Sequence, residues 1–237
     1  MVFIIRRIKD FLGNLKRAIE VALKDPVIKE ALMAYNWDET VLNEGMELVI
    51  KAETMYQKQI KEKGEQFRAR KIFEDLFEEV EQIVRENIKF TRLLCRKDEK
   101  KLAELGLNQR RDRTINGWIQ QTKVYYSNLL TDDELIAKHM RFGITKEQLE
   151  ANYQKVLDVQ TAKEQHDIET GEAEAATQER NEVFDEVYEY ALQFGTVSEA
   201  ALKDKPQHLE KLTITVYSPG YKPDRDEDQA DENEAAV

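Results

Sequence analysis

The sequence predicts an all-α protein built from two copies of one helical unit, and three observations lead to this prediction. Glycine and proline are scarce, with nine and four residues in a chain of 237. All-β proteins use many of both in their turns, so this composition favours helices. Apolar residues recur at three- and four-residue steps over long stretches, as in amphipathic helices. The third observation is an internal repeat.

The repeat appears when the sequence is shifted along itself by 107 residues, which aligns its halves without a gap. About 18 of the 107 aligned pairs are identical, and many others exchange one apolar residue for another. Matching pairs include Ile8 with Ile115, Asp25 with Asp132, Met33 with Met140, Gly64 with Gly171 and Val80 with Val187. We therefore expect one repeat over 1–107, a second over 108–216, and an acidic, disordered tail over 217–237.

Each half begins with a helix and a shorter second helix. The expected ranges are 8–23 and 27–35 in the first copy, and 115–130 and 134–142 in the second. Asp25 and Asp132 stand where a carboxylate accepts hydrogen bonds from the first N–H groups of the second helix. Asn36 and Gly143 predict the end of that helix, because both residue types tolerate the left-handed conformation that ends helices. Asp38 and Thr145 can then cap the next helix.

Two long periodic stretches complete most of each half, at 39–63 and 66–93 and again at 146–170 and 173–200. Gly64 and Gly171 separate stretches of nearly equal length, which predicts a long antiparallel helical hairpin in each copy. The alternative is a continuous helix of about 50 residues that tolerates a glycine at about 1 kcal/mol. A short last helix follows in each copy, and Pro206 suits its first turn.

The two hairpins are expected to pack together as a four-helix-type core related by a pseudo-twofold axis, with the short helices capping its ends. Two separate bundles joined near residues 106–113 are the alternative packing. Both arrangements place the apolar stripe of each long helix against a partner.

Charge is unevenly distributed along the chain, whose formal net charge is −11. Residues 222–237 hold seven acids and two bases, and the stretch from Lys89 to Arg113 holds nine bases and four acids. The basic stretch could bind an anion or an acidic tail, although such runs usually form a solvated face. Net acidity argues against a nucleic-acid partner.

Searches for catalytic chemistry give no catalytic residue and no cofactor-binding motif. The sequence lacks a phosphate-binding glycine-rich loop, a nucleophile elbow and a zinc-protease motif. No histidine has a histidine or cysteine neighbour at ligand spacing. Cys95 is the only cysteine, so it forms no intramolecular disulfide, and we expect a small packed side chain and a cytoplasmic protein.

Two carboxylate pairs could bind a divalent metal. Asp75 and Glu79 stand one helical turn apart, and Glu182 and Glu186 occupy the equivalent positions in the second copy. Pairs of this kind facing each other would supply the oxygen ligands that hard cations prefer. This spacing is similar to the acidic motifs of the PhoU family, which is also duplicated and all-helical, although the flanking residues here depart from its pattern. The simpler interpretation is that these acids lie on the solvated face of a helix.

One further resemblance covers most of residues 1–216. The second copy contains Trp118-Ile119-Gln120-Gln121, then Phe142-Gly143-Ile144-Thr145, and ends with Pro206-Gln207-His208-Leu209-Glu210-Lys211-Leu212. This pattern resembles an uncharacterised bacterial family of duplicated all-helical proteins whose closing motif is Pro-Gln-x-Leu-Glu-x-Leu-Gly-Ile. Thr213 replaces the glycine here. The resemblance implies a helical fold and no activity.

We therefore expect a non-enzymatic structural or interaction protein, in which the acidic tail binds the basic stretch of a neighbouring copy. A helical bundle that binds a small molecule or a divalent metal is the second hypothesis, and Trp37, Trp118 and several tyrosines could line its pocket. A third is a peripheral membrane protein anchored by residues 1–17, where Phe3, Ile4, Ile8, Phe11 and Leu15 share a face beside basic residues.

Overall fold

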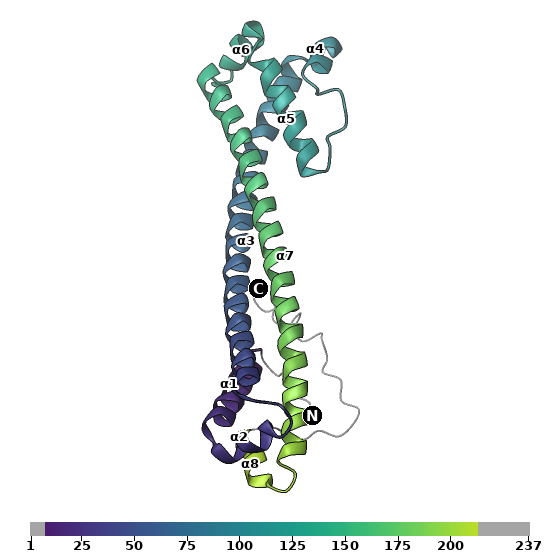
Figure 1. Ribbon diagram of the computed structural model, residues 1–237. Coiled ribbons are helices and arrows are strands. Elements are labelled where there is room, and N and C mark those ends of the chain that lie inside the picture. The colour runs from purple at the N-terminus through teal and green to yellow at the C-terminus, as the bar shows by residue number, and fades with distance from the viewer. Residues whose placement is uncertain (1–7, 213–237) are drawn as a thin grey trace. The chain divides into compact units, whose positions relative to one another are not determined.

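The computed structural model describes residues 8–212, and the helices in that range confirm the predicted all-α class (Figure 1). In chain order they are α1 (Ile8–Lys24), α2 (Pro26–Met33), α3 (Glu39–Leu94), α4 (Glu99–Glu104), α5 (Ile115–Leu129), α6 (Asp133–Met140), α7 (Lys146–Ala201) and α8 (Pro206–Lys211). No strand occurs within the described range. The tail predicted over 217–237 and the residues Phe3 and Ile4 lie outside it.

The predicted helix ends are confirmed at residues whose side chains cap the backbone. Asp25 accepts hydrogen bonds from the N–H groups of Val27 and Ile28, and Asp132 accepts one from Leu135. Asn36 and Gly143 adopt φ angles of 60° and 76°, the left-handed conformation expected of them. Asp38 and Thr145 likewise accept from the first turns of α3 and α7.

The predicted hairpins at Gly64 and Gly171 are wrong. Each glycine lies inside a continuous helix of 56 residues, α3 or α7, and a Cβ atom added to either would meet nothing within 4 Å. A glycine in a helix interior costs about 1 kcal/mol relative to alanine, which tertiary packing of the rest of the helix readily offsets.

The burial pattern of α3 is that of a continuous helix. Buried positions at 52, 59, 73, 80 and 87 are separated by seven or fourteen residues, so they keep one heptad register across Gly64. Polar residues occupy several register positions near the glycine, among them the buried Gln59 and the half-buried Gln66. These polar residues made the stripe look interrupted in the sequence, whereas its phase is unbroken.

The chain forms two compact units, and each takes helices from both halves of the sequence. Of the residues described, unit 1 comprises 8–60 and 175–212, and unit 2 comprises 61–174. The predicted repeats 1–107 and 108–216 remain a division of the sequence, because the compact units divide the chain differently. The helix α3 has 56 residues and α1 has 17, so α1 covers only part of α3. The rest of α3 belongs to the other unit.

Unit 1 packs α1, α2 and α8 against the start of α3 and the end of α7 (Figure 1). Its core includes Phe11, Leu15 and Ile19 of α1 with Val187 and Phe194 of α7, all almost fully buried. The described part of the face proposed as a membrane anchor therefore lies in this core. Within residues 8–212, no helix is long and apolar enough to cross a membrane.

Unit 2 packs α5 and α6 against the end of α3 and the start of α7. Lys155 pairs with Glu79 at 2.6 Å, and Gln66 donates to Thr170 at 3.4 Å, so α3 and α7 run antiparallel within this unit. Its core contains Trp118, Tyr125 and Tyr126 of α5. The expected four-helix core of two hairpins is thus replaced by one core in each unit.

Candidate functional site

The main candidate site is a basic pocket in unit 2, with a volume of about 400 Å³. It lies between α3, α5 and the segment that connects α4 to α5. Its lining comprises Arg85, Ile88, Lys89, Arg92, Gly106, Leu107, Gln109, Arg111, Trp118, Gln121 and Thr122. Four of these side chains are basic and none is acidic. The pocket therefore combines an apolar floor with a positively charged rim.

Helical spacing places three of the bases on one face of α3, because Arg85, Lys89 and Arg92 follow one another at steps of four and three residues. Arg111 reaches the same rim from the connecting segment. Burial lowers the pKa of the Arg111 guanidinium, the nearby charges of Arg85 and Arg92 lower it further, and Glu81 opposes both effects. The rim thus holds like charges close together, an arrangement that a bound anion would stabilise.

Glu81 is the counter-ion at the edge of the pocket. Its carboxylate lies 3.1 Å from Arg85 and 3.3 Å from Arg111. One carboxylate thus faces two of the four bases. Lys89 and Arg92 leave the rim with an excess of positive charge.

Hydrogen bonds from α3 and α5 hold the connecting segment over the pocket. Gln121 accepts from the backbone N–H of Asp112 at 2.9 Å and donates to the carbonyl of Arg110 at 3.2 Å. Arg92 donates to the carbonyl of Leu107 at 3.3 Å. The backbone on both sides of Gln109 is therefore positioned by side chains that also line the pocket.

Two glycines permit this conformation. Gly106 adopts a φ of 68° just after α4, where a side chain would be strained. At Gly117, in the first turn of α5, a Cβ atom would overlap the carboxyl group of Asp112. Asp112 in turn accepts from the N–H of Thr114 at 2.8 Å, and the hydroxyl of Thr114 caps α5. The connecting segment is therefore closely packed onto the start of α5.

Trp118 forms the aromatic part of the pocket floor. It is only 3% exposed, and its ring packs edge-on against Phe77 with centroids 4.9 Å apart. Its Nε1 has no hydrogen-bond partner among the residues described. The indole ring contributes apolar surface to the pocket, and its N–H is a hydrogen-bond donor that is unpaired within the described range.

The charge of the pocket is not repeated in unit 1. The positions equivalent to Arg85, Lys89 and Arg92 carry Leu192, Thr196 and Glu199. The basic rim therefore belongs to unit 2, and no comparable set of bases stands at these positions in unit 1.

A second specialised feature is a buried polar cluster in the core of unit 2. Asn87 donates to the hydroxyl of Tyr126 at 2.7 Å. The hydroxyl of Thr91 lies 2.7 Å from that of Tyr125 and 2.9 Å from Nε2 of His139. All five side chains are at most 4% exposed. In unit 1, Phe194 and Ile19 stand at the positions equivalent to Asn87 and Tyr126. Ser198, Ala18 and Leu32 stand at those equivalent to Thr91, Tyr125 and His139.

His139 is neutral in this cluster. Its Nδ1 lies 2.9 Å from the carbonyl of Leu135, which can only accept, so Nδ1 carries the proton. Nε2 faces the Thr91 hydroxyl, which also donates to the carbonyl of Asn87 at 2.9 Å. Burial lowers the pKa of His139. Burial also raises the pKa of Tyr126 to about 12, so the tyrosines are neutral too and the cluster holds no charge.

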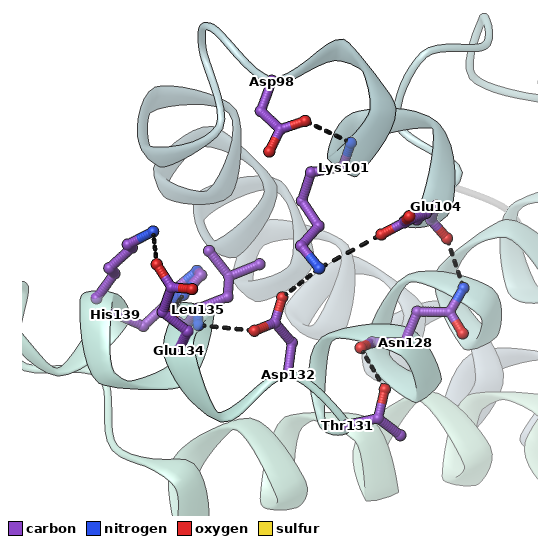
Figure 2. A network of polar contacts seen from close by, with 10 residues as sticks. Asp98, Lys101, Glu104, Asn128, Thr131, Asp132, Glu134, Leu135 and His139 are labelled. Atoms are coloured by element: carbon purple, nitrogen blue, oxygen red, sulfur yellow. Dashed lines mark hydrogen bonds and ion pairs between the residues drawn. The ribbon is translucent and has the colours of Figure 1, made fainter.

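Figure 2 shows the polar contacts beside His139 that connect α4, α5 and α6. Lys101 of α4 pairs with Asp132 at 2.6 Å, and Asp132 also caps α6. Asn128 of α5 donates to the carbonyl of Glu104. Cys95 is buried nearby as predicted, and burial raises the pKa of its thiol. These contacts stabilise the end of unit 2 and leave the cysteine in its unreactive form.

The predicted metal ligands are exposed. Asp75 and Glu79 lie in unit 2, and Glu182 and Glu186 lie in unit 1. Glu79 pairs with Lys155, Glu186 pairs with Lys51, and Glu182 accepts from Gln178. The metal site stays a prediction, and the structure gives three of these carboxylates lysine or glutamine partners.

The structure brings together a different acidic group, which sequence spacing did not suggest. Carboxylate oxygens of Glu62, Glu65 and Glu169 lie within 4.8 Å of one another. Lys61 contacts both Glu62 and Glu65, at 3.3 Å and 3.1 Å. This lysine offsets part of the repulsion, so the group has a cation of its own.

Three of the pocket bases, Lys89, Arg92 and Arg111, belong to the basic stretch that the sequence singled out. Arg85 was missed because it precedes that stretch and joins it only through the turn of α3. Comparison of the chain with protein-family models, characterised proteins and solved structures found no significant match. The functional argument therefore rests on the pocket itself.

Proposed function

We propose that the protein is a non-enzymatic interaction protein in which the basic pocket of unit 2 binds a carboxylate-rich segment of a protein partner. The observation that supports this proposal is the set of four bases around an apolar floor with no acid in the lining. Arginine can bind a carboxylate through two parallel hydrogen bonds. The rim carries three guanidinium groups, two of which share the carboxylate of Glu81.

The composition of the pocket lining and the hydrogen bonds of the connecting segment both fit binding better than catalysis. The pocket lining contains no histidine, cysteine or carboxylate that could act as a nucleophile or general base. The buried histidine and cysteine of unit 2 lie in its packed core. The connecting segment is held by several hydrogen bonds, which reduces the conformational entropy lost on binding.

The test uses a fluorescein-labelled octaglutamate peptide as an acidic probe and fluorescence anisotropy as the readout. We expect the full chain to bind the probe with an affinity that falls as salt rises. A variant with Lys89→Glu and Arg111→Glu should lose affinity by about tenfold or more. The matched control changes Arg96 and Arg141 to glutamate, two exposed arginines that do not line the pocket. Equal losses in both variants would show a diffuse charge effect and contradict the proposal.

A small organic anion is the second candidate ligand, because a volume of about 400 Å³ lies within the range of small-molecule sites. Native mass spectrometry of the purified protein would detect a retained anion as a constant added mass. Loss of that mass in the Lys89→Glu and Arg111→Glu variant would locate the ligand in the pocket.

We also propose that the two halves arose by tandem duplication. The starts of α5, α6, α7 and α8 each lie 107 residues after those of α1, α2, α3 and α4, which supports this origin. The basic rim and the buried polar cluster are then features of one compact unit, unit 2, to which both copies contribute residues.

A further inference from the structure

We infer that the acidic partner segment is residues 221–234 of a second copy of this chain, here termed the acidic segment. This inference rests on the proposed function, since it names the occupant of the same pocket. It starts from the two chemical requirements of the pocket, an apolar floor and a positive rim.

The floor requires an apolar or aromatic group. Ile88, Leu107 and Trp118 present it from α3, the connecting segment and α5. A segment composed of acids alone would bind the rim and leave this surface exposed to water. The occupant therefore needs a large side chain near its carboxylates.

The acidic segment has this composition. It begins with Tyr221 and continues with seven acids, the first at Asp224 and three more at residues 226–228. An extended chain advances about 3.3 Å per residue, so a segment bound in that conformation would hold its first acid about 10 Å from the tyrosine. With the Tyr221 ring on the floor beside Trp118, the acids that follow reach the rim bases. Aromatic pairs of this kind favour offset or edge-on contact.

The charges also match. The segment carries seven acids against Lys222 and Arg225, and the pocket carries four bases against the single carboxylate of Glu81 at its edge. Every copy of the chain supplies one pocket and one acidic segment, so pockets and segments are always present at equal concentrations. Such a contact joins two different surfaces and builds open chains or rings of copies.

The test uses two variants of the full chain and measures mass by light scattering after size exclusion. The pocket variant carries Lys89→Glu and Arg111→Glu. The segment variant carries Tyr221→Ala, Asp226→Asn, Glu227→Gln and Asp228→Asn. At low salt, we expect the mass of the natural chain to rise with concentration above 27.8 kDa. Each variant alone should remain a single chain, with the association constant lowered by about tenfold or more.

Mixing the two variants gives the decisive measurement. One supplies an intact segment and the other an intact pocket, so we expect a complex of twice the chain mass that neither forms alone. Restored association also shows that the pocket of the segment variant is folded, and far-ultraviolet circular dichroism checks the helices of the pocket variant. A control with Glu172→Gln, Glu174→Gln and Asp185→Asn removes three exposed acids outside the pocket lining and should associate normally.

Two outcomes overturn the inference. In the first, the natural chain keeps a single-chain mass at every concentration, as it also would if the segment bound its own copy. In the second, the mixed variants form no complex. If octaglutamate binding still depends on Lys89 and Arg111 in either case, the proposed function stands and only the partner assignment fails. If that dependence is also lost, both fail.

Discussion

The hydroxyl of Thr91 lies 2.9 Å from Nε2 of the fully buried His139 in the core of unit 2. The equivalent residues in unit 1 are Ser198 and Leu32, and the Ser198 hydroxyl has no hydrogen-bond partner among the residues described. The same helical framework therefore holds a satisfied polar cluster in one unit and an apolar core with one unpaired hydroxyl in the other.

This contrast predicts opposite effects for two similar substitutions. Thr91→Ala removes a partner of both His139 and Tyr125, so we expect a loss of about 1–3 kcal/mol in the free energy of unfolding. Ser198→Ala removes a buried hydroxyl that lacks a partner, so we expect a gain of up to about 1 kcal/mol. Urea unfolding of the two variants and the natural chain measures both changes. A loss of stability in Ser198→Ala equal to that in Thr91→Ala would contradict the comparison.

The neutral state of His139 predicts a pH dependence of stability. Burial lowers its pKa in the folded chain below the ordinary 6.5, so only the unfolded chain takes up this proton as the pH falls through that value. Stability should therefore fall below pH 6.5, by at most about 1.4 kcal/mol per pH unit for this group. His139→Gln cannot take up the proton, so its free energy of unfolding should decline less between pH 7 and pH 5. Unfolding in urea at these pH values tests this, and an unchanged slope in the variant would exclude His139 as the source.

The continuous helices predict that two glycine substitutions stabilise the protein. Gly64→Ala and Gly171→Ala add a methyl group where nothing lies within 4 Å, so each should raise the free energy of unfolding by about 0.5–1 kcal/mol. Gly45→Ala is the contrasting variant, because its Cβ atom would overlap the ring of Tyr190. We expect it to lower the thermal midpoint while the other two raise it. Destabilisation by all three would favour a turn at Gly64 and Gly171.

The close packing at Gly117 predicts a loss of binding with little loss of helix. Gly117→Ala displaces Asp112 and with it the segment that carries Arg111. We expect octaglutamate affinity to fall several-fold while far-ultraviolet circular dichroism stays unchanged. Asn116→Ala, one residue earlier and exposed, is the control and should bind normally. Normal binding by Gly117→Ala would show that the contact between Gly117 and Asp112 is not needed to position the connecting segment.

Much of the fold was predictable because local signals are strong where helices begin and end. The carboxylates of Asp25 and Asp132 and the left-handed residues Asn36 and Gly143 occupy their expected positions. The hairpins were not predictable from the same signals, because a glycine amid charged residues suits both a turn and an exposed helix. The unbroken heptad register across Gly64 was the signal that favoured the helix.

The candidate site was predictable only in part. The sequence indicated an unusual density of bases between Lys89 and Arg113, and it offered an anion site as one of two interpretations. Arg85 and the apolar floor were missed, because Arg85 lies outside the basic stretch and Trp118 lies beyond it in the sequence. Both join the site through the turn of α3 and the packing of α5.

By itself, the sequence determined the helical class and the helix boundaries at their capping residues, because periodicity and capping act between residues close in the chain. Only the tertiary structure decided that α3 and α7 continue through Gly64 and Gly171, and that each compact unit combines both halves. It also decided that four bases surround one pocket. These features depend on contacts between residues far apart in the chain, whose free energies outweigh the small local preference of a glycine or a polar side chain.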